Sequence, residues 1–303
     1  MSLGRMLAAT LVFATAPASA FAQDDAPKLR VGGQVRVIAD DARLSVPRGE
    51  DIPLSQGKRL FVLEVDTDRV LVQHEVEGKA VPGWIAAADV APLAGKALAF
   101  DGVSSKVEAP SVAFDELDAF TIEAWVYNWQ GAVACQGRAG DPENSVWISL
   151  GARADAGVPH ESCGWESGRG ANVEAAVGFG NKDEWNHVAM VFDGMRQRVF
   201  LNGKPIRSRR AAKPGPLNLE RPFILGAHHY AESLSFGTGL LRSLRITSRA
   251  RYRGEFGPLP ILEADEDTIV LYDAMEAEGD DLRDGSGNMR HGRMVDVKLV
   301  DSP

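Results

Sequence analysis

Three oxygen-bearing side chains, Asp284, Ser286 and Asn288, stand at alternate positions near the end of this 303-residue chain. Alternating oxygen ligands open a calcium-binding loop, which also needs a bidentate Glu at its twelfth position. That position holds Val295. The pattern therefore favours a turn built on Asp and Gly over a cation site, and no metal-ligand set is predicted.

A second set of residues has the chemistry of ligand contacts. Polar, Gly-rich loops are expected at 137–144 and 152–171, and binding residues concentrate on such loops. Sugar and peptide sites combine aromatic faces with a few converging polar groups. The residues of this kind are Trp165, Arg169, His228, His229 and Tyr230. We predict ligand binding at these positions, although Trp165 has an alternative place beside a disulfide.

Seven cations and no anion occur between residues 196 and 213. In an acidic protein such a cluster can meet an anionic glycan or an acidic partner. A second segment, 255–284, carries many carboxylates and a single Arg, so an internal ion-pair surface or two solvated faces are the alternatives. The seven residues of this basic patch are Arg196, Arg198, Lys204, Arg207, Arg209, Arg210 and Lys213.

The first 22 residues have the composition of a signal peptide. Arg5 precedes an apolar run at 6–16, and small residues allow cleavage after Ala20 or Ala22. The run is shorter than a membrane span, so we expect a periplasmic or secreted protein that does not span the membrane. In an oxidising compartment Cys135 and Cys163 are expected to pair, with two free thiols as the alternative.

Loss of Arg5 with the signal segment changes the formal net charge from −9 to −10. That acidity disfavours nucleic acid as a partner.

Short β-strands are expected to position the candidate residues. Residues 188–206 contain three strand-like runs separated by Asp193-Gly194 and Asn202-Gly203, which supply tight hairpin turns. In 120–126 apolar residues alternate with Thr121, Glu123 and Trp125, as in a strand with two different faces.

These runs predict an all-β protein with two domains. Residues 23–28 form a linker, 29–93 a small barrel of short strands, and 96–303 a large two-sheet antiparallel sandwich. The first domain resembles bacterial Src-homology-3-like domains. The residues that carry this resemblance are Gly83-Trp84-Ile85 and the short helical turn expected at 86–90.

The second domain resembles the LamG-like jelly-roll domains of the concanavalin-A-like lectin/glucanase superfamily. The carriers are LAFDG (98–102), FTIEAWV (120–126), WNHVAMVFDG (185–194), VFLNGKPI (199–206) and GLLRSLRI (239–246). A last block, 264–294, resembles a segment that opens the domain in many members but closes this chain. The resemblance therefore implies that 268–272 lies next to 97–101 and that the domain's ends meet.

The resemblance also bears on catalysis and calcium. Glucanases of this superfamily use a Glu-x-Asp-x-x-Glu strand, whereas the nearest segment here begins at Glu263 and has Thr268 in place of the final Glu. We therefore predict no catalytic residues and no enzyme activity. Members often bind calcium through an Asp in the late strand, where this chain has Arg242. Because a cationic side chain cannot ligate calcium, Arg242 disfavours calcium without ruling it out, and no cofactor is expected.

Together these features predict a non-catalytic secreted binding or adhesion protein. Its lectin-like sandwich would recognise a glycan or a protein of the envelope or extracellular space. The alternative is a structural scaffold subunit of a cell-envelope or surface assembly, and a minor third reading is a glycoside hydrolase with an unfamiliar site.

Overall fold

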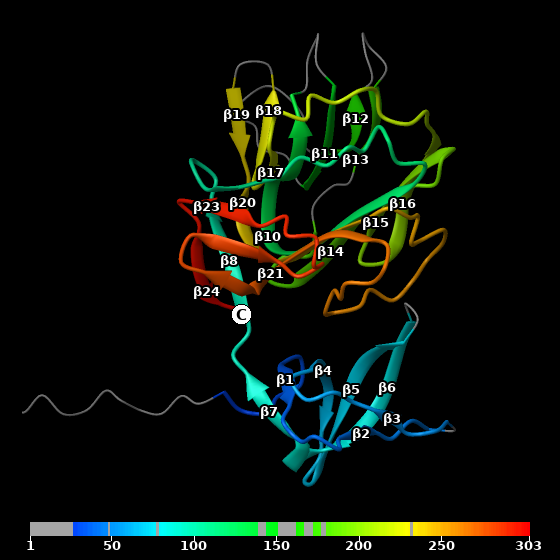
Figure 1. Ribbon diagram of the computed structural model, residues 1–303, viewed down its shortest axis with the longest axis vertical. Helices are drawn as coiled ribbons and strands as arrows, with labels where there is room; N and C mark the ends of the chain where they lie inside the picture. Colours follow the sequence, from blue (N-terminus) through cyan, green and yellow to red (C-terminus); the bar gives the residue numbers. More distant parts are fainter. Residues whose placement is uncertain are drawn as a thin grey trace, which may run out of the picture.

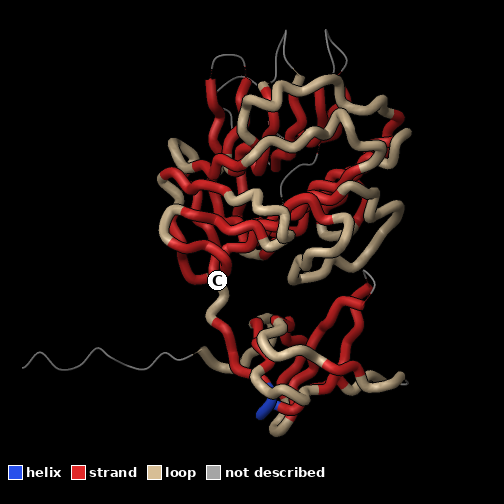
Figure 2. The backbone as a smooth tube through the Cα atoms, in the orientation of Figure 1, coloured by secondary structure: helices blue, strands red, loops and turns tan. Residues whose placement is uncertain are grey.

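Two bodies of β-strands follow one another along the chain (Figure 1). The computed structural model describes residues 27–47, 49–76, 79–138, 144–150, 162–166, 172–176, 180–230 and 233–303. The predicted signal peptide, residues 1–22, lies outside the described residues. Figure 2 shows strands throughout the described chain and a single short helical turn, Ala87–Asp89. The predicted all-β class is confirmed.

The N-terminal body is an antiparallel sheet in the order β6-β5-β4-β1-β7, with the β2–β3 hairpin beside it. Its own core includes Val35, Leu60 and Ile85. Gly83 is needed where β6 passes β2, because a Cβ there would lie 2.5 Å from Leu44 Cγ. The resemblance to Src-homology-3-like domains stays a prediction. The strands are β1 (Gln34–Val37), β2 (Arg43–Leu44), β3 (Ile52–Pro53), β4 (Arg59–Val65), β5 (Arg69–Val76), β6 (Lys79–Ala86) and β7 (Val90–Leu93).

The C-terminal body consists of two antiparallel sheets that share one long strand, β10 (Phe120–Gly137). The first half of β10 lies between β14 and β20, and its second half lies between β11 and β17. The first sheet therefore runs β16-β15-β14-β10-β20, and β8 and β21 follow one another along the far edge of β20. The second sheet runs β13-β12-β11-β10-β17-β9-β23-β22.

The bounds of the other strands are β8 (Lys96–Asp101), β9 (Lys106–Ala109), β11 (Ser145–Leu150), β12 (Ser162–Glu166), β13 (Asn172–Ala176), β14 (Trp185–Phe192), β15 (Arg196–Leu201), β16 (Lys204–Arg210), β17 (Phe223–Leu225), β18 (Ala227–Tyr230), β19 (Ser233–Phe236), β20 (Thr238–Thr247), β21 (Thr268–Glu278), β22 (Asp281–Asp284), β23 (Gly292–Val295) and β24 (Lys298–Asp301). Strands β18 and β19 form a separate hairpin. The predicted jelly-roll sandwich is confirmed.

The main core fills the space between the two sheets. Phe120, Ile122, Ala124 and Val126 all point into it, as the alternation along the sequence predicts. The largest fully buried side chains of this body include further aromatic rings from both sheets. The other face of β10 is covered as well, so this strand is buried on both sides over its first half.

The C-terminal tail belongs to the sandwich. Strand β21 pairs with β20, and β8 pairs with the same edge of β20 further along, so the predicted neighbourhood of 268–272 and 97–101 is confirmed. The last strand, β24, pairs with β8, the first strand of the sandwich. The ends of the sandwich thus meet in one sheet (red and cyan in Figure 1).

A strand-free segment, residues 248–266, crosses the outer face of the first sheet (orange in Figure 1). We call it the strap. It brings Tyr252 and Phe256 onto Ala189, Val191 and Phe200, and these side chains form a small core of their own. The apolar side chains of the strap therefore form a second layer over the sheet.

The strap also meets the N-terminal body. Lys58 Nζ on the loop before β4 lies 2.5 Å from Glu263 Oε2 of the strap. Next to it, Arg59 Nη2 lies 2.8 Å from Asp273 Oδ2 on β21, and both partners of this pair are largely buried. The strap is therefore a middle layer between the two bodies.

The predicted Cys135–Cys163 disulfide is wrong, because both thiols are free and buried. Cys135 pairs with Trp147 across β10 and β11, whereas Cys163 pairs with Ile148 across β11 and β12. Consecutive residues of a strand point to opposite faces, so the two cysteines do too. Strand β11 lies between the two cysteines, so their Cα atoms are about 10 Å apart, whereas a disulfide needs Cα atoms within about 7 Å of each other.

Both thiols should therefore be present but unreactive in the native protein. Burial raises the pKa of Cys135 and of Cys163 to about 12, so almost no thiolate forms at neutral pH. Alkylation at pH 8 without reductant should label neither cysteine in the folded protein and both after denaturation. Denatured, unreduced protein with no free thiol would contradict the structure.

Candidate functional site

Trp165 is not available to a ligand. It is fully buried in the sandwich core, with its ring centroid 5.6 Å from that of Phe120 and 5.2 Å from that of Phe192. Its Nε1 donates to Ala212 O at 3.0 Å, so its single donor is satisfied. The ligand-contact prediction is wrong for this residue. The alternative, a packing role, holds, although no disulfide lies beside it.

The structure does not bring the other predicted ligand residues together into one site. His228 on β18 is buried, with its ring centroid 5.5 Å from that of Trp147, and His229 is half-buried. Arg169 lies outside the described residues, as does the side chain of Tyr230. Ligand binding at these positions stays a prediction.

The oxygens considered for calcium are used by turns. The carboxylate of Asp284 accepts the backbone N–H groups of Leu271, Ser286 and Arg290 at 2.9–3.0 Å. Asn288 donates from Nδ2 to two carbonyls of β21. This is the turn that the sequence favours. Among the described residues, no three acidic, His or Cys side chains are arranged to hold a metal ion.

Arg242, at the position where the resemblance implies a calcium-binding Asp, faces aromatic rings. A register shift between β10 and β20 leaves Arg242 as an extra residue on β20. Its guanidinium lies 4.5 Å from the centroid of the Trp185 ring and 5.0 Å from that of Trp125. Burial lowers the pKa of Arg242 to about 10 against the opposing effect of Asp273. The arginine thus makes a cation–π contact on the outer face of the first sheet.

The acidic segment 255–284 finds cations outside the basic patch. Asp265 pairs with Arg249 and Arg251 within the strap, while Glu263 and Asp273 pair with Lys58 and Arg59 of the N-terminal body. Six of the seven residues of the patch lie on the β15–β16 hairpin, and Lys213 follows three residues after the end of β16. There Arg198 pairs with Asp193 at 2.5 Å.

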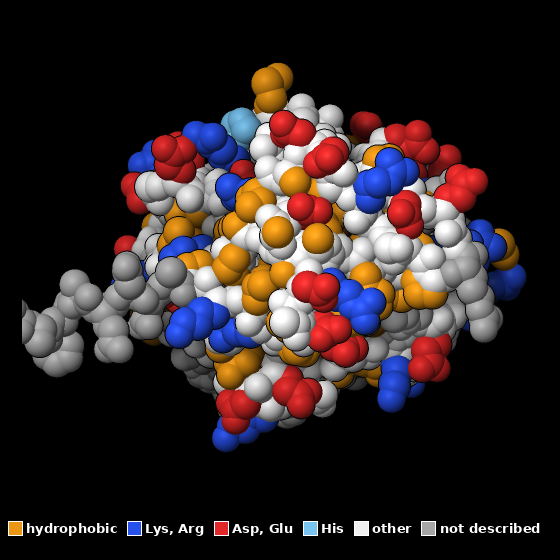
Figure 3. Space-filling model, turned by 90° about the horizontal axis from the view of Figure 1, so that it is seen from below, with side chains coloured by type: hydrophobic (Ala, Val, Ile, Leu, Met, Phe, Trp, Pro, Cys, Tyr) orange, Lys and Arg blue, Asp and Glu red, His pale blue; other side chains and the backbone are white. Residues whose placement is uncertain are grey.

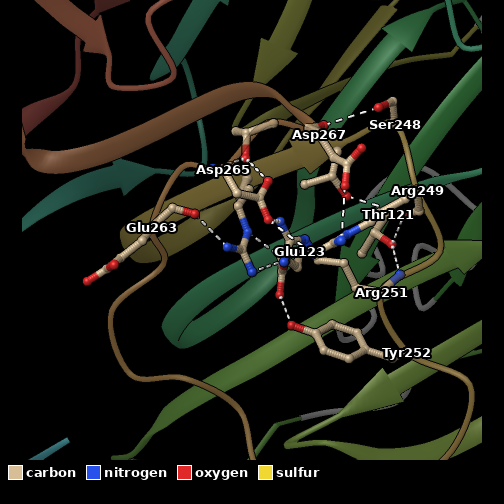
Figure 4. Close-up of polar contacts among 12 residues, drawn as sticks. Thr121, Glu123, Ser248, Arg249, Arg251, Tyr252, Glu263, Asp265 and Asp267 are labelled. Carbon is tan, nitrogen blue, oxygen red and sulfur yellow. Dashed lines mark hydrogen bonds and ion pairs between the residues drawn. The ribbon is translucent and has the colours of Figure 1, made fainter. Parts of the chain in front are cut away.

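A buried ionic cluster centred on Glu123 lies beneath the strap (Figure 4). Glu123 projects from the outer face of β10 and is fully buried. Its Oε1 accepts from Arg245 Nε at 2.8 Å, and its Oε2 lies 2.9 Å from His187 Nε2 and accepts from the Tyr252 hydroxyl at 2.8 Å. Arg251 Nε is 3.8 Å from Oε1. The carboxylate therefore joins three strands, β10, β14 and β20, to the strap.

The electrostatics of this cluster fix Glu123 as an anion. Burial alone would raise the pKa of Glu123, but Arg245 and then His187 hold it well below its ordinary value. Burial and the neighbouring Glu123 raise the pKa of Tyr252, which stays a hydrogen-bond donor. Arg245 also donates to Glu263 O at 2.6 Å. Because Glu123, His187 and Arg245 are fully buried, the cluster ties the strap to the sheet.

A cavity of about 430 Å³ opens where β10 changes neighbours. Strand β10 pairs with β14 as far as Tyr127 and with β11 only from Gly131 onward. Residues 128–130 of β10 therefore have neither strand beside them. Asn128 and Gly131 have positive φ values of 46° and 90°, which bend β10 at this point. We call this cavity the switch cleft.

The switch cleft has an apolar wall and an amide-rich rim. The wall is Val126, Trp129 and Leu150. Asn128 is held by two hydrogen bonds with Asp183, one from its Nδ2 to Oδ1 at 2.9 Å and one to its Oδ1 from the Asp183 N–H at 2.7 Å. The remaining lining residues are Gln130, Gly180, Asn181, Lys182 and Asn186. The sequence-based reasoning missed this site, because only pairing partners reveal the gap beside β10.

The family model for the concanavalin A-like lectin/glucanases superfamily, Laminin_G_3, matches residues 101–255, just over half of the chain. The chain belongs to this family. The matched residues run from the end of β8 into the strap, so they include β10, the switch cleft and the Glu123 cluster. A comparison with curated proteins gives no match.

Several solved structures are similar to part of this chain. A SAP-like pentraxin from Limulus polyphemus is 14% identical over 65% of this chain and 97% of its own, with a TM-score of 0.37. Domain 4 of an arabinanase from Geobacillus stearothermophilus, solved with arabinotriose, is 19% identical over 65% and 80%, also at 0.37. Mouse laminin alpha1 domains LG4-5 are 13% identical over 79% and 90%, at 0.36.

Removal of the charge at the centre of the ionic cluster should destabilise the sandwich. Glu123→Gln leaves Arg245 buried without a counter-charge, so we expect a loss of about 3–5 kcal/mol in the free energy of unfolding at pH 7. Because the folded-state pKa of Glu123 is depressed, its contribution is complete above the unfolded pKa and fades as the pH falls below about 4. Urea titrations should show that the difference in free energy of unfolding between the wild-type protein and Glu123→Gln becomes smaller in acid.

The matched control is Glu266→Gln, which removes an exposed carboxylate from the same strap. It should change the free energy of unfolding by less than about 0.5 kcal/mol. Equal effects of the two substitutions would contradict the account of the cluster.

Proposed function

We propose that this protein is an exported, non-catalytic binding protein whose sandwich takes a glycan into the switch cleft. The observation that carries the proposal is the lining of that cleft. The exposed polar side chains of Asn128, Gln130 and Lys182, placed over an apolar floor in which Trp129 is only 5% exposed, suit a ligand with many hydroxyl groups. An exported location rests on the signal-like sequence at 1–22.

The same lining supports binding over hydrolysis. Glycosidases need two carboxylates a few ångströms apart at the scissile bond. Among the described residues that line the switch cleft there is no Asp or Glu. The buried Glu123 lies under the strap and is already bound by three partners. Among the described residues, no helix is long and apolar enough to cross a membrane.

Gln130 and Lys182 are the rim residues best suited to a test, because both are exposed and neither supports the core. A glycan array with the full chain should identify a bound sugar, and titration calorimetry should then give its Kd. Gln130→Ala and Lys182→Ala should each weaken that Kd by about fivefold, the equivalent of one net hydrogen bond. The control Lys298→Ala, on exposed β24, should leave it unchanged.

Silence of the array, with a protein recovered instead as the bound ligand, would overturn the glycan proposal. Sugar binding that survives both rim substitutions unchanged would place the site elsewhere and contradict the role of the switch cleft.

A further inference from the structure

Four exposed cations line the free edge of the first sheet. They are Arg196 on β15 and Lys204, Arg207 and Arg210 on β16, and we call them the cationic edge. Among the described strands, β16 pairs only with β15, so it ends the sheet (Figure 1). No carboxylate of the described residues lies within ion-pair distance of these four side chains, whereas neighbouring Arg198 is paired with Asp193.

Two of these cations face each other directly. Arg196 is the cross-strand partner of Arg210. The next pair along the strands is hydrogen-bonded, since Ala211 N donates to Met195 O at 3.0 Å. Arg196 and Arg210 therefore form a non-hydrogen-bonded pair, in which side chains approach most closely. Like charges in that position are destabilising. The Arg196–Arg210 pair is therefore unfavourable by itself, even though the chain as a whole has a net charge of −9.

The cations project on both sides of the edge. Arg196 and Arg210 share the outer face with Arg198, while Arg207 is opposite Val199, whose side chain points into the core. From Lys204 to Arg210 the strand extends about 20 Å. The result is a ridge of charge about 20 Å long, and a flat surface would touch only one of its sides.

The backbone of this edge is poorly suited to pair with a further strand. Pro205 lacks an N–H donor, and a register shift between Val199 and Phe200 distorts the hairpin. Such features block strand addition at sheet edges. The side-chain charges, and not the open backbone, are therefore the recognition feature.

We infer that the cationic edge binds a linear anionic polysaccharide through its carboxylate or sulfate groups. Arginine presents a planar fork of donors that matches such groups, and three of the four residues are Arg. A flexible chain can contact both sides of the ridge and exchange its counterions for protein charges. This site is separate from the switch cleft, so it does not depend on the proposed glycan binding there.

The test measures binding of the full chain to heparin and, separately, to polygalacturonate at 50 mM salt. The double variant Arg207→Gln/Arg210→Gln should weaken both affinities at least tenfold. The control Arg30→Gln/Arg36→Gln removes the same charge from exposed positions of the N-terminal body and should change them less than twofold. Because a repulsive pair is lost, Arg210→Gln alone should keep or raise the Tm.

Three results would overturn the proposal. The first is no binding of either polysaccharide at 50 mM salt. The second is an equal loss of affinity in both double variants, which would reflect net charge alone. The third is binding to vesicles containing phosphatidylserine that depends on Arg207 and Arg210 while polysaccharide binding does not. Failure at this edge leaves the switch-cleft titrations unaffected, so the two proposals fail independently.

Discussion

Burial of one charge, the Glu123 carboxylate, is the constraint on which the arrangement of this protein depends. A buried anion is tolerated only when donors and counter-charges surround it. Those groups come from strands β14 and β20 and from the strap, at His187, Arg245 and Tyr252. The carboxylate therefore favours this path of the strap, because any other path would take the Tyr252 hydroxyl and the Arg251 charge away from a fully buried anion.

The strap in turn sets the relation of the two bodies. Its apolar residues Tyr252 and Phe256 stack with their ring centroids 3.5 Å apart on the outer face of the first sheet. Its opposite side offers Glu263 to Lys58, beside the Arg59–Asp273 pair. Figure 3 views the molecule from the end formed by the N-terminal body, where charged side chains of both signs surround hydrophobic ones. On the side that faces the sandwich, by contrast, opposite charges meet in defined pairs. Neither proposed ligand surface, the switch cleft or the cationic edge, includes a residue of these pairs.

Local patterns in the sequence predicted the local features of the fold. The Asp-Gly and Asn-Gly turns predicted the β14–β15–β16 meander, and the alternation at 120–126 predicted which side chains of β10 enter the core. The features that the sequence did not predict correctly depend on pairing between distant parts of the chain. Cys135 and Cys163 point to opposite faces because of the registers on both sides of β11. Likewise Glu123 is covered by residues about 130 positions later, and the switch cleft exists only because β10 changes partners. The LamG-like resemblance supplied the family, but not these contacts.

The central claim is that Glu123 holds the strap as firmly as the sheet beneath it. Native-state hydrogen exchange measures this directly, because amides that open only on global unfolding exchange with the full free energy of unfolding. The strap amides that donate hydrogen bonds, such as Arg251 N to Thr121 Oγ1 and Phe256 N to Gly203 O, should exchange as slowly as those of β10 and β20. Rapid exchange of the strap, at several kcal/mol below the sheet, would contradict the account.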